Sequence, residues 1–226
     1  NINGIKARFE PLTEWLQTSA PDVAVLQEIK SIDENFPREH FQDLGYTVET
    51  HGQKSLNGVA ILSKLPLEDV TRGLPGDDDD EQARWIEATV VGEKALRICG
   101  LYLPNGNPAP GPKYDYKLSW MKRLHARAQD LLASEEPALM AGDYNVIPQA
   151  EDAARPEAWR EDALFRYESR RAFRRSGRKN GGGGGNHRSP CENLRLPSGG
   201  GKRFAGRPRP QCPQRVCGDG RPHVHR

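Results

Sequence analysis

The chain has 226 residues, enough for one large domain or two small ones, and no apolar run reaches the roughly 18 residues that a membrane span needs. Its formal net charge of +2 averages two different parts: residues 1–165 hold 17 Lys and Arg against 28 Asp and Glu, a net charge of −11, and residues 166–226 hold 16 against 3, a net charge of +13. Such asymmetry indicates a segment that faces nucleic acid or a segment of foreign origin.

Cysteine usage points to a reducing compartment. Of the four cysteines, Cys99 lies alone in an apolar strand pattern and the other three lie near the C-terminal end. One cysteine in the body of the chain provides no disulfide framework, and no signal-peptide pattern is present. We therefore expect a cytoplasmic protein.

The predicted elements alternate between strands and helices. In chain order, apolar residues recurring every three or four positions predict a helix over 9–19, and a short apolar run predicts a strand over 22–28. Runs rich in β-branched and aromatic residues then predict strands over 46–52, 58–64, 84–91 and 96–104. A helix over 117–132, a strand over 138–145 and a helix over 161–175 complete the pattern. This mixture predicts sheets covered by helices.

The amino-acid composition changes after Arg175. Residues 176–226 contain 12 of the 23 glycines, and Phe204 is their only aromatic residue. Such a composition buries too little apolar surface to offset the entropy lost on ordering. We predict a low-complexity, basic and disordered tail over 176–226, after a domain over 1–175.

Three short segments place polar side chains where a strand is predicted to stop: NING at 1–4, LQEIK at 26–30 and AGDYNVIP at 141–148. Functional sites are commonly built at such positions. Glu28 and Asn1 offer oxygen ligands of the kind that Mg²⁺ takes. Asp143 suits a general base or a group that orients a water molecule, and Asn145 suits a group that fixes a phosphate.

Ordinary structural roles are the alternative for the same residues. Glu28 could cap a helix or end a turn, and Asp143 with Asn145 could form an Asx turn. Spacing alone does not decide between a metal site and these roles.

Six motifs occur in a definite order along the chain: NINGIKAR (1–8), PDVAVLQEIK (21–30), THGQKSLNGVAILSK (50–64), RGLPGDDDDEQARWIEA (72–88), GLYLPNGN (100–107) and LMAGDYNVIP (139–148). In this order they resemble the exonuclease III family of AP endonucleases, within the endonuclease/exonuclease/phosphatase superfamily. The resemblance covers about residues 1–175.

The resemblance implies both a fold and an activity. The fold is a four-layered α/β sandwich, with two sheets face to face and helices outside, here incomplete at both ends. The activity is hydrolysis of DNA phosphodiester bonds in base excision repair, with Mg²⁺ or Mn²⁺ as cofactor. It comprises cleavage 5′ to abasic sites and 3′→5′ exonuclease action. The implied partner is double-stranded DNA with abasic sites or 3′ ends, and the protein is expected to be a monomer.

The matching motifs also imply roles for residues. Glu28 resembles the metal ligand of the family, and Asn1 resembles its asparagine neighbour. Asp143 resembles the residue that activates or aligns water, Asn145 resembles its partner in holding the phosphate, and Tyr102 resembles the active-site tyrosine.

Three basic residues resemble DNA contacts of the family: Arg84 and, by a looser match, Lys113 and Lys117. The aspartate run at 77–80 is predicted to be a solvated loop. Solvated surface positions without a DNA contact are the alternative for all three basic residues, and core packing is the alternative for Tyr102.

The C-terminal part departs from the family pattern. Segments reading Trp-Asp-Tyr, Arg-Ile-Asp and Ser-Asp-His, the last of which supplies an Asp–His pair in the family, do not occur here. We therefore predict impaired activity. Arg, Gly, Pro and Ser have GC-rich codons, so a tail dominated by them suggests out-of-frame translation near residue 175. A zinc site at Cys212, Cys217, His223 and His225 and a nucleic-acid-binding tail are the rival interpretations of this segment.

Two other functions stay open on the sequence alone. The chain could be a non-catalytic, truncated fold with a basic nucleic-acid-binding tail. It could also be a phosphoesterase of the same superfamily that acts on small phosphates or lipids.

Overall fold

The computed structural model describes residues 1–176, and the predicted tail with its candidate zinc ligands lies outside this range. The helices and strands are α1 (Ile5–Ser19), β1 (Val23–Gln27), α2 (Arg38–Asp43), β2 (Thr47–His51), β3 (Val59–Ser63), β4 (Leu67–Arg72), β5 (Trp85–Val90), β6 (Leu96–Tyr102), α3 (Pro112–Ala133), β7 (Ala138–Asp143) and α4 (Tyr167–Ser176). Short 3₁₀ helices lie at Asp33–Asn35, Ala150–Asp152 and Pro156–Trp159. Within the described range, no helix combines the length and apolarity needed to cross a membrane.

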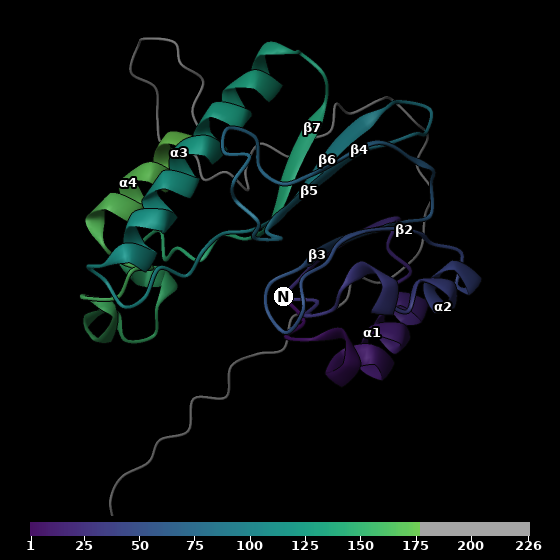
Figure 1. Ribbon diagram of the computed structural model, residues 1–226, viewed down its shortest axis with the longest axis horizontal. Coiled ribbons are helices and arrows are strands. Elements are labelled where there is room, and N and C mark those ends of the chain that lie inside the picture. Colours follow the sequence, from purple (N-terminus) through teal and green to yellow (C-terminus); the bar gives the residue numbers. More distant parts are fainter. Residues whose placement is uncertain (177–226) are drawn as a thin grey trace, which may run out of the picture. The chain divides into compact units, whose positions relative to one another are not determined.

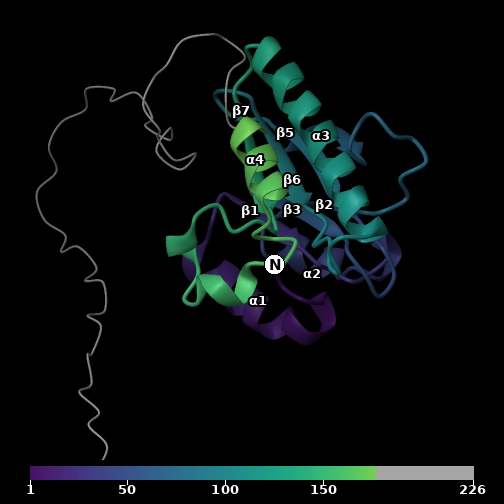
Figure 2. The same ribbon diagram turned by 90° about the vertical axis from the view of Figure 1, so that its left-hand side faces the viewer.

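The described strands form two sheets. The first has the order β1-β3-β2 and is antiparallel, and the second has the order β4-β5-β6-β7, in which only β6 and β7 run parallel. In Figure 1, α1 and α2 lie outside the first sheet, and α3 and α4 lie outside the second. Figure 2 shows α3 and α4 packed beside each other on their sheet.

Three apolar clusters hold these layers together. One joins α1 and α2 to the first sheet, one joins α3 and α4 to the second sheet, and the third lies between the sheets. Strand β3 shows how alternation builds them: Ala60 and Leu62 face the helices, while Val59 and Ile61 face the opposite sheet. The predicted α/β architecture of two facing sheets with outer helices is therefore confirmed.

The element boundaries differ from the predicted ones where local sequence carries little signal. Strand β4 was not predicted, because half of its residues are charged and it lies at the edge of its sheet. Helix α2 has only six residues, too few to show a helical period. The last helix begins at Tyr167 rather than at 161, because the Asp162 side chain accepts from the backbone N–H of Leu164 at 2.8 Å and holds a turn there.

A buried carboxylate ties α3 to the second sheet. Glu87 on β5 is only 3% exposed, and its oxygens accept hydrogen bonds from Arg127 on α3 at 2.6 and 3.1 Å. Nη1 of Arg97, on the neighbouring strand β6, lies 3.8 Å from Glu87 Oε1. Burial, together with the negative charge of Glu87, raises the pKa of the neighbouring Cys99 thiol to about 12. The thiol therefore stays protonated and acts as a core residue.

Strand ends position the candidate site. Strands β6 and β7 run parallel with Tyr102 opposite Asp143, so both strands end at the same edge of the second sheet. Strand β1 of the first sheet ends one residue before Glu28. Three predicted site residues are thus carried by the last residues of strands or the residue just beyond.

Candidate active site

The ends of three strands meet through side-chain hydrogen bonds. The Tyr102 hydroxyl donates to Glu28 Oε1 at 2.6 Å. The Asn1 side-chain amide donates to Glu28 Oε1 at 2.9 Å and to Asp143 Oδ2 at 3.0 Å. Four residues predicted from separate motifs therefore form one connected cluster with two carboxylates.

Two of the predicted site residues have left-handed backbone. Glu28 has φ of 54° and Asn145 has φ of 43°, a region that side chains other than glycine enter at a cost. At Asn145 the cost is offset by an Asx turn, in which Asp143 Oδ1 accepts from the Asn145 backbone N–H at 2.9 Å. At Glu28 the carbonyl accepts from the Gly4 N–H at 2.7 Å. The Asx-turn alternative is thus correct for Asp143 and Asn145, and the turn presents them to the site.

The Glu28 carboxylate is held in its charged form. Partial burial would raise its pKa, but hydrogen bonds from Tyr102, Asn1 and Lys30 and the positive charge of Lys30 lower it to about 2. For Tyr102, burial and the hydrogen bond to Glu28 raise the pKa of the phenol well above its usual value. The tyrosine therefore stays a hydrogen-bond donor at neutral pH.

A cation already lies against the predicted metal ligand. The Lys30 ammonium is 3.0 Å from Glu28 Oε2 and also contacts the side-chain oxygen of Asn3. The Glu28 carboxylate and the Asn3 amide oxygen thus converge on a positive charge. These two oxygen ligands fit Mg²⁺, because this ion commonly binds one or two carboxylates together with water and substrate phosphates. Among residues 1–176, no group of three or more His, Cys, Asp or Glu side chains could hold a metal by itself.

The prediction that Asn1 supplies a metal-ligating oxygen is not supported by this geometry. Its Nδ2 faces both carboxylates, and its Oδ1 accepts from the Asn3 backbone N–H at 3.1 Å. Asn1 instead bridges Glu28 and Asp143, whereas the Asn3 oxygen faces the cation position. Asn3 and Lys30 were missed, although each lies two positions after a predicted site residue. Their backbone is left-handed, with φ of 49° and 50°, and this conformation carries no clear signal in the sequence.

Lys117 lies inside the protein rather than on a DNA-facing surface. The residue is 0% exposed, and its ammonium donates to the carbonyl oxygens of Asn105 at 3.1 Å and Asn145 at 2.6 Å. Burial lowers the pKa of Lys117 to about 8, against the opposing charges of Asp162 and Asp143. The predicted DNA contact by Lys117 is therefore wrong for this arrangement, and the lysine supports the two loops that follow β6 and β7.

The other predicted basic residues lie in different surroundings. Lys113 is exposed on the first turn of α3. Arg84 is half-buried, with its guanidinium 4.8 Å from the centroid of the Tyr102 ring. Asn145 turns its side-chain N–H toward the Leu103 carbonyl at 2.8 Å. Only Arg84 of the three basic residues contacts the cluster around Glu28.

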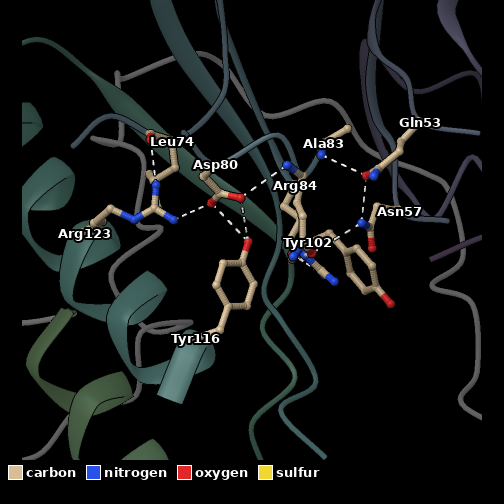
Figure 3. A network of polar contacts seen from close by, with 10 residues as sticks. Gln53, Asn57, Leu74, Asp80, Ala83, Arg84, Tyr102, Tyr116 and Arg123 are labelled. Carbon is tan, nitrogen blue, oxygen red and sulfur yellow. Dashed lines mark hydrogen bonds and ion pairs between the residues drawn. The ribbon is translucent and has the colours of Figure 1, made fainter. Parts of the chain in front are cut away.

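The aspartate run is only partly the solvated loop that was predicted. Residues 77–79 are exposed, but the Asp80 side chain is 8% exposed and pairs with Arg123 of α3. Tyr116 of α3 also donates to both oxygens of Asp80, at 2.9 and 3.0 Å, as Figure 3 shows. The last aspartate of the run is therefore an anchor between the loop and α3.

Comparisons with known proteins agree with this architecture. The sequence matches the profile of the Endonuclease/Exonuclease/phosphatase family over residues 1–213, beyond residue 175, where the resemblance was predicted to end. Exodeoxyribonuclease III of Haemophilus influenzae is 38% identical over 153 residues, which cover 66% of this chain and 56% of that protein. The chain thus spans little more than half the length of that relative.

Two solved structures share the fold at similar identity. An AP endonuclease from Archaeoglobus fulgidus superposes with a TM-score of 0.73 at 34% identity, covering 78% of this chain and 67% of that one. The 3′ phosphatase NExo from Neisseria, bound to a product DNA hairpin, superposes with a TM-score of 0.74 at 33% identity and the same coverage. Together with the family profile, which covers most of the sequence, these matches show that the chain belongs to the endonuclease/exonuclease/phosphatase family, in its branch of exonuclease III-like AP endonucleases.

Proposed function

We propose that this chain hydrolyses phosphodiester bonds of double-stranded DNA with the help of a divalent cation, Mg²⁺ or Mn²⁺. The reaction would cut 5′ to abasic sites and remove nucleotides from 3′ ends. One observation carries the proposal: Glu28, Tyr102, Asp143 and Asn1, from four separate motifs, form a single hydrogen-bonded cluster at the strand ends. Relatives named as exodeoxyribonuclease III and AP endonuclease support the choice of reaction.

The residues of the cluster would have different roles in the reaction. Glu28, with the Asn3 oxygen beside it, would hold the cation, which when bound polarises a phosphoryl oxygen and neutralises charge that develops there. Asp143 accepts one hydrogen bond on each oxygen from the protein, and a carboxylate keeps further lone pairs to align or deprotonate a water molecule. Tyr102 stays protonated and donates a hydrogen bond.

Asn145 would orient the phosphate, and Asn1 would hold the two carboxylates in place. Each side-chain amide has two N–H donors, and Asn145 uses one of them on the Leu103 carbonyl. The remaining N–H of Asn145 suits a phosphate oxygen. Asn1 keeps the carboxylates of Glu28 and Asp143 at a fixed separation by donating to both.

We further propose that this chain acts as a monomer and is slower than its longer relatives. Within residues 1–176, the hydrogen bonds that Asp143 accepts come from Asn1 and from the Asn145 backbone, and none comes from a histidine. A water-aligning carboxylate without such a partner is held less firmly. Light scattering after size exclusion tests the monomer, and single-turnover rates beside the Haemophilus influenzae enzyme test the slower reaction.

The experiment that tests the function uses a labelled duplex with one abasic-site analogue. We expect a single cut at the analogue with Mg²⁺ and none with EDTA. Glu28→Gln should lower the rate by about 100-fold or more, while DNA binding measured by fluorescence anisotropy in EDTA changes little.

Glu34→Gln is the matched control, because Glu34 is exposed and carries the same charge close by in the sequence. It should leave cleavage unchanged. DNA binding without any Mg²⁺-dependent cleavage by the unaltered chain would favour the alternative, a non-catalytic fold that binds nucleic acid.

A further inference from the structure

The loop between β4 and β5, residues 73–84, is fixed at its acidic end to helix α3. Asp80 pairs with Arg123, which also donates to the Leu74 carbonyl at 3.1 Å, so one guanidinium holds both halves of the loop. Tyr116, two helical turns before Arg123, donates to Asp80 from the same face of α3. The ion pair is almost fully buried, since the side chains are 10% and 8% exposed.

From Asp80 a chain of hydrogen bonds runs to the active-site tyrosine, and Figure 3 shows its path. Asp80 Oδ1 accepts from the Gln82 backbone N–H at 3.2 Å. Gln82 Oε1 accepts from Arg84 Nε at 2.7 Å. Arg84 then donates to the Tyr102 carbonyl at 3.2 Å and covers the Tyr102 ring, whose hydroxyl reaches Glu28.

The same loop is also fixed from the first sheet. Gln53, in the connection between β2 and β3, accepts from the Ala83 backbone N–H at 3.1 Å and from the Asn57 side chain at 2.8 Å. Asn57 in turn lies 3.5 Å from Gln82 Oε1. Side chains of the β2–β3 connection, of the β4–β5 loop itself and of α3 therefore determine where Arg84 lies.

We propose that Asp80 and Gln82 are positioning residues of the candidate active site, and that they act by holding Arg84 against Tyr102. Arg84 limits the Tyr102 ring to one orientation, because it contacts the ring face and the carbonyl of the same residue. A tyrosine held in this way keeps its hydroxyl on Glu28, and small displacements of such groups lower rates strongly. This inference rests on the proposed nuclease function for its kinetic readout.

The decisive variant is Gln82→Met, since it removes the acceptor for Arg84 and leaves the buried pair of Asp80 and Arg123 in place. We expect kcat for cleavage at the abasic-site analogue to fall about tenfold, while KM changes by less than about twofold. Gln82→Glu keeps an acceptor oxygen and should retain the rate. In an Arg84→Met background, Gln82→Met should cause no further loss.

A second readout does not depend on activity. The ¹⁵N–¹H signal of Arg84 Nε should be sharp and shifted by the Tyr102 ring in the unaltered protein, and it should lose this shift in Gln82→Met. Asp80→Asn should have the same effect. Asp78→Asn removes the same charge from an exposed position of the loop, and it should alter neither the signal nor kcat.

Three results would overturn the inference: an Arg84 signal that does not respond to Gln82→Met, a changed signal with normal kcat, or losses that add in the Arg84→Met background. If the unaltered chain does not cleave DNA at all, the proposed function fails instead. The Arg84 signal then decides alone: its loss in Gln82→Met and Asp80→Asn supports the positioning role, and its persistence refutes it.

Discussion

The Lys117 ammonium donates a hydrogen bond to the carbonyl oxygen of Asn145 at 2.6 Å, and Lys117 is fully buried under the loop that follows Asp143. A second hydrogen bond to the Asn105 carbonyl joins the loops after β6 and β7. Lys117→Met would leave both carbonyls without this donor, so we expect a loss of about 1–3 kcal/mol in the free energy of unfolding at pH 7. Lys122→Met, on the exposed face of the same helix, should change stability little.

The stability effect of Lys117 should also depend on pH. Because the pKa in the folded protein is lowered to about 8 from 10.5, the unfolded chain binds more protons between these values. Stability of the unaltered protein should therefore rise with pH from about 8 to 10, by about 1 kcal/mol per pH unit relative to Lys117→Met. Denaturant melts of both proteins at pH 7, 8, 9 and 10 measure this, and parallel curves would contradict it.

Lys30 should compete with the divalent cation. Its ammonium lies 3.0 Å from Glu28 Oε2 and contacts Asn3, so a metal ion must displace this charge or share the carboxylate with it. Lys30→Met should tighten Mn²⁺ binding about fivefold, as removal of a nearby positive charge in a solvated site predicts. Titration followed by electron paramagnetic resonance tests this without DNA. Lys54→Met, an exposed substitution, is the control, and weaker binding by Lys30→Met would instead assign Lys30 to orienting Glu28.

Tyr102→Phe removes the hydroxyl that donates to Glu28 at 2.6 Å. A hydrogen bond to a charged carboxylate contributes about 1.5–3 kcal/mol, so loss of this bond should lower kcat about 10- to 100-fold if it orients Glu28 in the transition state. The apolar part of the ring is kept, so the melting temperature should fall by only the several degrees that loss of this hydrogen bond predicts. Tyr167→Phe, at a tyrosine that is 67% exposed, should have normal kcat. A Tyr102→Phe protein with full activity would exclude the hydroxyl from the reaction.

The buried Glu87 should be among the most sensitive positions for stability. Glu87→Gln leaves Arg127 and Arg97 facing a neutral side chain across a buried surface, and breaking such pairs costs about 3 kcal/mol or more. Glu93→Gln, at an exposed position, should cost less than about 0.5 kcal/mol. Chemical denaturation measures both. A near-neutral Glu87→Gln would mean that the arginines find new partners or water.

An out-of-frame origin of residues 176–226 makes a prediction at the level of the gene. Reading the nucleotide sequence across codons 170–226 in all three frames should show Trp-Asp-Tyr, Arg-Ile-Asp and Ser-Asp-His segments in an alternative frame. If no frame contains them, the hypothesis is wrong, and DNA binding by residues 176–226, which hold 11 Lys and Arg residues, becomes the leading interpretation.

Local patterns predicted most of the strands because sheet residues here are strongly apolar. Strand β3 is a continuous run of buried residues between polar ends, and β5 and β6 are similar. Motif resemblance predicted that Glu28, Tyr102 and Asp143 act together, and they do share one hydrogen-bonded cluster. Neither kind of reasoning required knowledge of side-chain directions.

Side-chain environment was less accessible to prediction because it depends on residues distant in sequence. Lys117 looks like a surface lysine in its own helix, and only the carbonyls of Asn105 and Asn145 explain its burial. In the sequence, nothing distinguishes Asp80 from the three aspartates before it. Only its pairing with Arg123, 43 positions away, explains its burial. The direction of the Asn1 amide likewise follows from the Asn3 backbone and both carboxylates.

The left-handed backbone at Glu28 and Asn145 costs conformational free energy at two positions whose side chains belong to the candidate site. Glycine would relieve a cost of about 1–2 kcal/mol at Glu28, and less at Asn145, since asparagine tolerates this region better. Glycine at position 28 would, however, also remove the hydrogen bonds that Glu28 accepts from Tyr102 and Asn1 and its ion pair with Lys30. The contacts that fix this carboxylate therefore offset the cost of the backbone that presents it, so the turn and the side-chain cluster stabilise each other.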